Sequence, residues 1–164
     1  MAKWYEYTEF SESFYETAPF RVVTKVSIKA PAAKVFSVLE DGDAWPRWIP
    51  AVKRVEWTSP QPFEVGTTRS VYMKTGQRID ERFIVWETNR RMGFTVIGSD
   101  VPGLTSFGED YIITPTATGC DVRWTFALQP RGFIPQGLFV IRPAFRMALK
   151  FTLLSFKKVV ERSP

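Results

Sequence analysis

The sequence predicts an α+β domain in which a seven-stranded antiparallel sheet curves around a long C-terminal helix. Five strand-like runs after Gly66 follow one another with only short turn signals between them, which is typical of an antiparallel meander. Two further strand-like runs lie closer to the N-terminus, and two short helical segments separate them. A helical repeat of apolar residues that starts near Pro143 closes the chain.

The first half of this pattern is a strand, two short helices and a second strand. Alternating apolar and polar side chains predict the first strand over residues 21–29. A short helix follows from Ala30-Pro31 and ends at Asp41-Gly42-Asp43, residues that favour a turn. The second strand is predicted over residues 53–58.

Two tryptophans, Trp45 and Trp48, lie on either side of a proline between the first short helix and the second strand. One interpretation is that both rings pack as plugs between the short helices and the C-terminal helix. The alternative is that they line the opening of a cavity.

The remaining strands form the meander. Apolar and polar side chains alternate regularly along the last of these strands, which predicts one buried face and one solvent-exposed face. The five strands are predicted over residues 67–73, 77–87, 91–98, 105–114 and 120–129. Pro143 fits the first turn of the closing helix, and Met147, Phe151 and Leu154 widen its apolar arc. We therefore expect this helix to lie across the concave face of the sheet, with Arg146, Lys150 and Lys157 pointing away.

Length and composition predict one domain with a large core or a lined pocket, since 45% of the 164 residues are hydrophobic and 15% are aromatic. Residues 1–20 show no clear period and are interpreted as an extension of a single domain over residues 21–162. The single cysteine, Cys120, favours a reducing compartment, and no signal peptide is visible, so a cytoplasmic protein is expected.

The absence of histidine excludes several classes of function. Without histidine and with one cysteine, the chain has no zinc site, no Ser-His-Asp triad and no Cys-His pair. It also lacks both glycine-rich nucleotide motifs, so no metal and no cofactor is predicted. Any catalysis would have to use carboxylate, tyrosine, lysine or arginine side chains.

The net charge of +5 is uneven, because the first 20 residues are acidic and residues 142–162 are strongly basic. A solvated helix face explains the basic end, and weak association with an anionic membrane is the second interpretation. Nucleic acid is not predicted as a partner, because no basic run is interleaved with aromatic residues. The oligomeric state is not determined by these features.

Several motifs in this order resemble the START-like superfamily, also called the polyketide cyclase/dehydrase and lipid-transport (SRPBCC) family. They are IKAPAAKVFSVLED from Ile28, WPRW from Trp45, VGT from Val65, VWETNRRM from Val85 and GCDVRWTF from Gly119. The resemblance covers about residues 20–162 and implies the helix-grip fold, with a deep apolar cavity for lipids, sterols, quinones or polyketides. Gln61-Pro62-Phe63-Glu64 stands where the plant allergen branch has a glycine-rich loop.

Strand parity identifies the polar residues that would face such a cavity. If Lys74-Thr75-Gly76 is a three-residue hairpin loop, Arg69 faces Glu81 across the strands and both point inward. A two-residue turn would instead place Ser70 opposite Glu81. A four-residue loop between the last two strands turns Glu109 inward among aromatic side chains.

Glu81 and Glu109 are the candidate catalytic residues. The candidate ligand-binding residues are Trp48, Arg69, Val71, Glu81, Phe83, Phe94, Phe107, Glu109, Tyr111, Trp124, Phe126, Phe145 and Leu149. Arg69 and Glu81 could simply satisfy each other, with Glu109 bonded to Tyr111; they could fix the polar head of a ligand; or a carboxylate could act as a base.

The preferred function is the binding or transport of a hydrophobic small molecule, such as a lipid, a quinone or a polyketide-like compound. The alternative is a metal-free cyclase or aromatase that uses carboxylate, Tyr and Arg side chains. A third possibility is a regulatory domain that binds a partner protein. The apolar segment from Arg131 to Pro143 is interpreted as ordinary packing or, alternatively, as a lid or membrane-touching patch.

Overall fold

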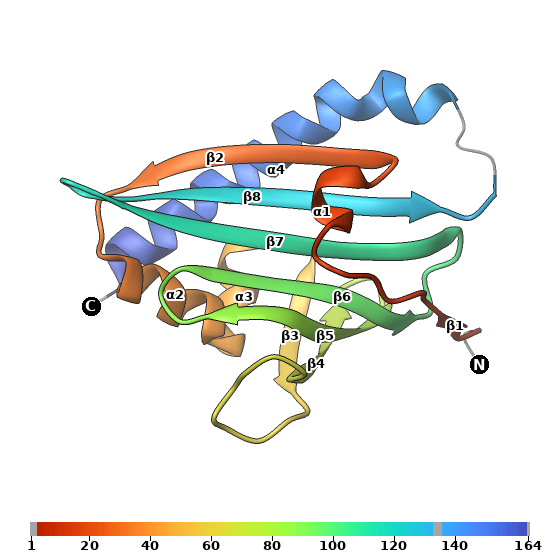
Figure 1. The fold of residues 1–164 in the computed structure, drawn as a ribbon, viewed down its shortest axis with the longest axis horizontal. Helices are drawn as coiled ribbons and strands as arrows, with labels where there is room; N and C mark the ends of the chain where they lie inside the picture. The colour runs from red at the N-terminus through yellow and green to blue at the C-terminus, as the bar shows by residue number, and fades with distance from the viewer. Residues whose placement is uncertain (1–2, 133–135, 164) are drawn as a thin grey trace.

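The computed structural model describes residues 3–132 and 136–163, and these form a curved antiparallel sheet with helices on both faces (Figure 1). Seven strands follow the order β2-β8-β7-β6-β5-β4-β3, and a short eighth strand, β1, pairs with the end of β6. Their bounds are β1 Tyr5–Glu6, β2 Phe20–Ile28, β3 Val52–Trp57, β4 Thr68–Met73, β5 Arg78–Glu87, β6 Arg91–Ser99, β7 Leu104–Thr116 and β8 Gly119–Pro130. The seven predicted strands are confirmed.

The two short helices between the first two long strands are also confirmed. Helix α2 spans Ala32–Glu40, and Val35, Phe36, Val38 and Leu39 are buried. The carboxylate of Asp41 ends this helix by accepting a hydrogen bond from the amide of Asp43, which opens the 3₁₀ turn η1 at Gly42–Ala44. Helix α3, Trp45–Trp48, follows directly, and its proline occupies an early position where no amide donor is needed.

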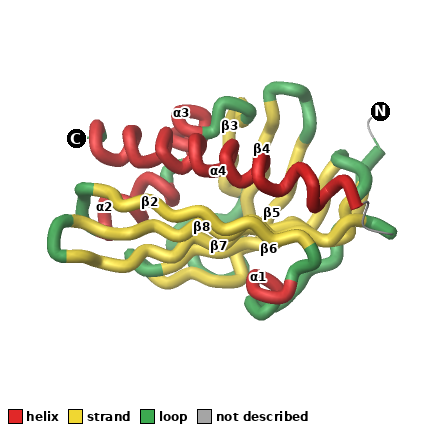
Figure 2. Tube along the Cα trace, turned by 90° about the horizontal axis from the view of Figure 1, so that it is seen from above, coloured by secondary structure: helices red, strands yellow, loops and turns green. Residues whose placement is uncertain are grey.

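The closing helix, α4, spans Gln136–Arg162 and lies over the opposite face of the sheet from α1 (Figure 2). Its start was predicted wrongly, because Pro143 lies inside the helix and not in its first turn. A proline inside a helix frees the carbonyl four residues before it, because proline has no amide hydrogen to donate. The segment from Arg131 to Pro143, predicted as ordinary packing or as a lid or membrane-touching patch, is described only in part, since residues 133–135 lie outside the described residues.

The apolar arc of α4 is narrower than the sequence suggested. Leu149, Leu153, Phe156 and Val160 are buried against β2 and the short helices. Met147 and Phe151, which were expected to widen the contact with the sheet, instead face solvent. The helix therefore packs mainly through its C-terminal half.

Two β-bulges set which side chains of β5 face inward. One lies between Asp80 and Glu81 and the other between Phe83 and Val85, relative to β6. The second bulge turns Val85 to the outer face, where it packs with Tyr15 and Ala127. Regular alternation along this strand predicts that Val85 shares the inner face with Ile79 and Phe83, and that prediction is wrong, because a bulge shifts the inward and outward alternation by one residue.

The N-terminal segment lies across the outer face of the sheet, in front of it in Figure 1, and α1 spans Phe14–Thr17. Three glycines of β6 and β7 leave room for its aromatic rings: Gly98 lies under Trp4, Gly108 under Phe10 and Gly93 under Tyr15. Carboxylates of the segment pair with arginines of the sheet, as in Glu9 with Arg82, Glu12 with Arg91 and Glu16 with Arg21.

Candidate functional site

The inner face of the sheet is the face toward α4, and the outer face is the one that the N-terminal segment covers. On the inner face, the register of the β4–β5 hairpin brings Arg69 and Glu81 together as an ion pair. The amide of Met73 donates to the carbonyl of Gln77 at 2.8 Å, and Gly76 has a φ of 97°, so the connection is the three-residue loop. Arg69 consequently lies opposite Glu81, and Val71 opposite Ile79. The alternative register, with Ser70 opposite Glu81, does not occur.

Arg69 is buried within aromatic rings. Its Nε donates to Oε2 of Glu81 at 2.6 Å, and its guanidinium carbon lies 3.9 Å from the ring centroid of Trp45. The rings of Phe83 and Phe94 are each 5.0 Å away. Such stacking on π faces favours a cation that has left water.

Two of the three guanidinium nitrogens of Arg69 are unused. Nη1 and Nη2 are both buried and have no hydrogen-bond partner among the described residues. Nε1 of Trp48, in the same aromatic cluster, is buried and unpartnered in the same part of the chain. Burying a hydrogen-bond donor without an acceptor costs about 1–3 kcal/mol of stability. These nitrogens are therefore candidate donors to an oxygen atom of a bound ligand.

Glu109 faces the same interior from β7. Its Oε2 accepts hydrogen bonds from the hydroxyl of Tyr111 at 2.5 Å and from Nε1 of Trp124 at 3.1 Å. Both donors are neutral, and burial raises the pKa of Glu109 to about 7 from an ordinary value of 4.5. Near neutral pH this carboxyl group can therefore hold or release a proton.

The ionisable groups of the interior influence one another. Burial raises the pKa of Glu81, and the neighbouring Arg69 guanidinium opposes that rise. Burial and the carboxyl group of Glu109 together hold the pKa of Tyr111 well above its usual value. The negative charge of Glu81 adds to the rise in the pKa of Glu109, and Arg69 counteracts it.

Both tryptophans of α3 are buried and pack as plugs in this structure. Trp48 contacts Phe156 of α4 with ring centroids 4.9 Å apart, and it meets the rings of Tyr111 and Trp124 edge to face. Trp45 lies between Arg69 and Tyr111. The alternative arrangement, in which they line an opening, is not the one observed.

The predicted ligand-binding residues gather in two neighbouring clusters on the inner face. The inner cluster surrounds Arg69 and is formed by Trp48, Arg69, Glu81, Phe83, Phe94, Glu109, Tyr111 and Trp124. The outer cluster is half-buried and consists of Phe107, Phe126 and Phe145, with ring centroids 4.6 and 4.9 Å apart. Val71 and Leu149 are buried in the same core.

Glu109 is the member of the inner cluster that borders the outer cluster. Across the sheet it pairs with Phe94 on one side and with Phe126 on the other. Trp57, which the sequence pattern does not identify, lies opposite Arg69 on β3 with its ring 5.4 Å from the guanidinium carbon. Residues 58–67 connect β3 to β4, and a connection of this length does not set the strand register as a short hairpin loop does.

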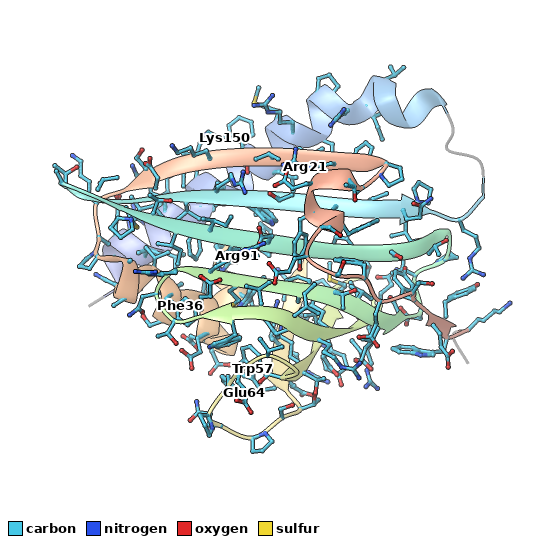
Figure 3. All side chains as sticks on the ribbon, viewed as in Figure 1. Arg21, Phe36, Trp57, Glu64, Arg91 and Lys150 are labelled. Atoms are coloured by element: carbon cyan, nitrogen blue, oxygen red, sulfur yellow. The ribbon has the colours of Figure 1, made fainter. Side chains whose placement is uncertain are left out.

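The hollows on the described surface include one beside α4 and one beside α2. The larger, about 780 Å³, lies between β2 and the first half of α4, where Figure 3 shows Arg21 and Lys150. The smaller, about 520 Å³, lies between α2 and the loop after β3 and is lined in part by Phe36, Phe63 and Trp86. Within the described residues, no group of three or more acidic or cysteine side chains is placed to hold a metal ion.

Sequence comparison finds relatives across most of the chain. Residues 19–161 match the model of a family described as polyketide cyclase / dehydrase and lipid transport. Uncharacterized proteins of Mycobacterium tuberculosis and Mycobacterium bovis are 38% identical over 149 residues, covering 91% of this chain and 89% of theirs.

Solved structures share the fold at low sequence identity. Ara h 8.0201 superposes with a TM-score of 0.67 at 13% identity, covering 88% of this chain and 99% of its own. A START superfamily protein from Mycobacterium smegmatis gives a TM-score of 0.63 at 15% identity, with 86% and 94% covered. A protein of Mesorhizobium loti gives 0.64 at 18% identity, with 88% and 99% covered.

Proposed function

Because the chain belongs to the polyketide cyclase/dehydrase and lipid transport family, we propose that it binds a hydrophobic small molecule between its sheet and α4. The family match and the START-like neighbours confirm the resemblance and the helix-grip fold predicted from the sequence. A lipid, a quinone or a polyketide-like compound fits the aromatic inner face best. A cytoplasmic location remains part of this proposal.

The unused Nη1 and Nη2 of Arg69 carry the proposal. They place several N–H donors inside an aromatic core, where a carbonyl or carboxylate oxygen of a ligand would satisfy them. The half-buried rings of Phe107, Phe126 and Phe145 would then hold the apolar body on the side of the first half of α4. Small-molecule sites commonly combine an apolar lining with a few convergent polar groups in this way.

The rings around Arg69 are closely packed, so a ligand would have to displace some of them. The outer cluster is the more accessible part, and α4 passes over it with Phe145 only half-buried. We therefore expect the ligand to arrive from the side of α4, with its polar end toward Arg69.

Native mass spectrometry of the purified protein, followed by solvent extraction, tests for a bound hydrophobic compound. Titration with two probes then tests the role of Arg69: dodecanoate has a carboxylate head, and N-phenyl-1-naphthylamine is neutral. The double variant R69M/E81M removes the donors without leaving a lone buried charge. We expect about tenfold weaker dodecanoate binding, equivalent to one charge-assisted hydrogen bond, and unchanged binding of the neutral probe.

The result for each probe has a distinct meaning. If the wild-type protein binds neither probe and carries no compound, binding in the interior is wrong. If the double variant binds both probes like the wild type, the interior binds ligands but Arg69 does not contact their heads. Arg82→Met is the matched control, because Arg82 pairs with Glu9 on the outer face.

A cyclase-type enzyme is the second candidate, and the position of Glu109 favours it. Its carboxyl group lies where the inner cluster borders the outer cluster, bonded only to the neutral donors Tyr111 and Trp124, with a pKa of about 7. A base of this kind could accept a proton from a carbonyl substrate near neutral pH. Glu109→Gln separates the functions: a binding protein keeps its affinity, and an acid–base enzyme loses turnover by orders of magnitude.

A further inference from the structure

The first half of α4 exposes a stripe of large apolar side chains. Val140 is 79% exposed, Ile141 52%, Met147 57% and Phe151 62%. Positions 140, 147 and 151 lie on one face of an α-helix, and that face is opposite the buried side chains of Leu149 and Phe156. This stripe therefore points away from the protein.

A row of basic side chains runs beside the stripe. Arg142, Arg146 and Lys150 are spaced four residues apart and line the groove of about 780 Å³ between α4 and β2. Arg21 and Lys25 of β2 line its other side, so every charged residue in the lining is basic. Residues 136–160 of the chain contain no aspartate or glutamate.

Part of this row also covers the free edge of the sheet. Arg142 donates to the carbonyl of Arg21, and Lys150 donates to the carbonyl of Lys25. These bonds pair groups of an edge strand that would otherwise attract another chain. Arg146 shows no such bond in the described structure, and its charge faces the open groove.

We propose that this half of α4 and the β2 edge form a docking surface for an anionic lipid membrane. An exposed apolar stripe beside a basic row is the pattern of a helix that lies in the interface of a bilayer. The apolar side chains would enter the acyl boundary while Arg146 meets lipid phosphates, and Arg142 and Lys150, which also hold the β2 edge, add positive charge beside it.

The charge of the surface argues against the other occupants. A second copy of the chain would bring two basic rows together, which opposes pairing. Nucleic acid would suit the basic row but would leave the apolar stripe in water. Within the described residues no helix is long and apolar enough to span a bilayer, so the contact proposed here is peripheral.

Vesicle flotation at low ionic strength tests the proposal. We expect the protein to float with vesicles of equimolar phosphatidylcholine and phosphatidylglycerol, and not with pure phosphatidylcholine. M147Q/F151Q should weaken this binding about tenfold or more, since both side chains would leave water on docking. Arg146→Gln should weaken it about fivefold, because each basic residue at an anionic surface contributes about 1 kcal/mol.

Matched controls use exposed residues elsewhere on the molecule. Val65→Gln removes an exposed apolar side chain from the loop before β4, and Lys53→Gln removes a charge from β3. Neither should change vesicle binding, and far-UV circular dichroism should show all four variants folded, because each altered side chain is exposed. These controls separate a local surface from a general effect of charge or hydrophobicity.

Any of the following outcomes would overturn the proposal. One is no binding to either type of vesicle. Another is equal binding to neutral and anionic vesicles, or binding that M147Q/F151Q leaves unchanged. The last is a concentration-dependent dimer in size-exclusion chromatography that M147Q/F151Q abolishes, because the stripe would then be an interface between two copies. None of these measurements depends on a ligand in the interior.

Discussion

Replacing Arg69 alone should destabilise the protein far more than replacing Arg69 together with Glu81. Arg69→Met removes the cation that pairs with the carboxylate of Glu81, whose side chain is 5% exposed. The carboxylate would then be buried without a partner, and burial alone already raises its pKa. R69M/E81M removes both charges and fills the same space with apolar side chains.

The distance within the pair gives the size of the effect. At 2.6 Å between Nε and Oε2, Coulomb attraction is about 6 kcal/mol with an effective dielectric constant of 20. Desolvation offsets part of this attraction, and breaking one partner of a buried pair costs about 3–5 kcal/mol. The double variant should lie within about 2 kcal/mol of the wild type, since it loses mainly the stacking of the guanidinium on Trp45.

Urea unfolding followed by tryptophan fluorescence measures both changes. Arg69→Met should lower the midpoint by about 2 M and the melting temperature by roughly 10 °C. Its deficit should shrink toward about pH 5, because a carboxyl group with a raised pKa destabilises the fold only where it is ionised. Equal losses in Arg69→Met and R69M/E81M would refute the reasoning, because packing and not the orphaned charge would then explain the cost.

Two further predictions concern the inner and outer faces. Burial raises the pKa of Glu109 to about 7, so the folded state holds a proton that the unfolded state releases above 4.5, and stability should fall by about 3 kcal/mol as pH rises through this window. Glu109→Gln should flatten that slope in unfolding measured at several pH values, and an unchanged slope would contradict the assignment. Gly108→Ala should cost about 3 kcal/mol or more, because its Cβ would lie 2.2 Å from the carbonyl oxygen of Phe94. Gly98→Ala should cost under about 1 kcal/mol, because the atoms nearest its Cβ belong to the ring of Trp4, which is 44% exposed and can move; similar melting temperatures for the two variants would contradict this account.

The interior network was predictable because hairpin loops fix strand register. The loop Lys74-Thr75-Gly76 determines that Arg69 faces Glu81, and a left-handed glycine at its third position is a recognisable signal. The same reasoning places Glu109 beside Phe126 and Tyr111 beside Trp124, although the predicted four-residue loop is wrong: β7 and β8 run on to a two-residue turn, Ala117-Thr118, which leaves the register unchanged. Local turn chemistry therefore specified contacts between residues that are more than ten positions apart.

Other features depend on tertiary contacts that no local pattern records. The bulge that turns Val85 outward leaves no sign in the sequence, because the neighbouring residues Phe83, Ile84 and Trp86 are apolar as well, so the alternation of apolar and polar residues is lost there. The outward position of Met147 and Phe151 depends on where α4 leaves the sheet. Trp4, Phe10 and Tyr15 pack over glycines that are about 80 to 100 residues away in the sequence. A search for periodicity cannot predict contacts between such distant residues.

Phe94 links the two faces of the molecule. On the outer face, its carbonyl accepts a hydrogen bond from the hydroxyl of Tyr15 at 2.9 Å, and the same oxygen would clash with any side chain at Gly108. On the inner face, its ring lies 5.0 Å from the guanidinium carbon of Arg69. The N-terminal segment therefore does more than cover the sheet: by holding the backbone of β6 at this residue, it helps to position one of the rings around the guanidinium of Arg69. Because packed interiors transmit small shifts, loss of the Tyr15 contact should disturb the ring of Phe94 and, through it, the surroundings of Arg69.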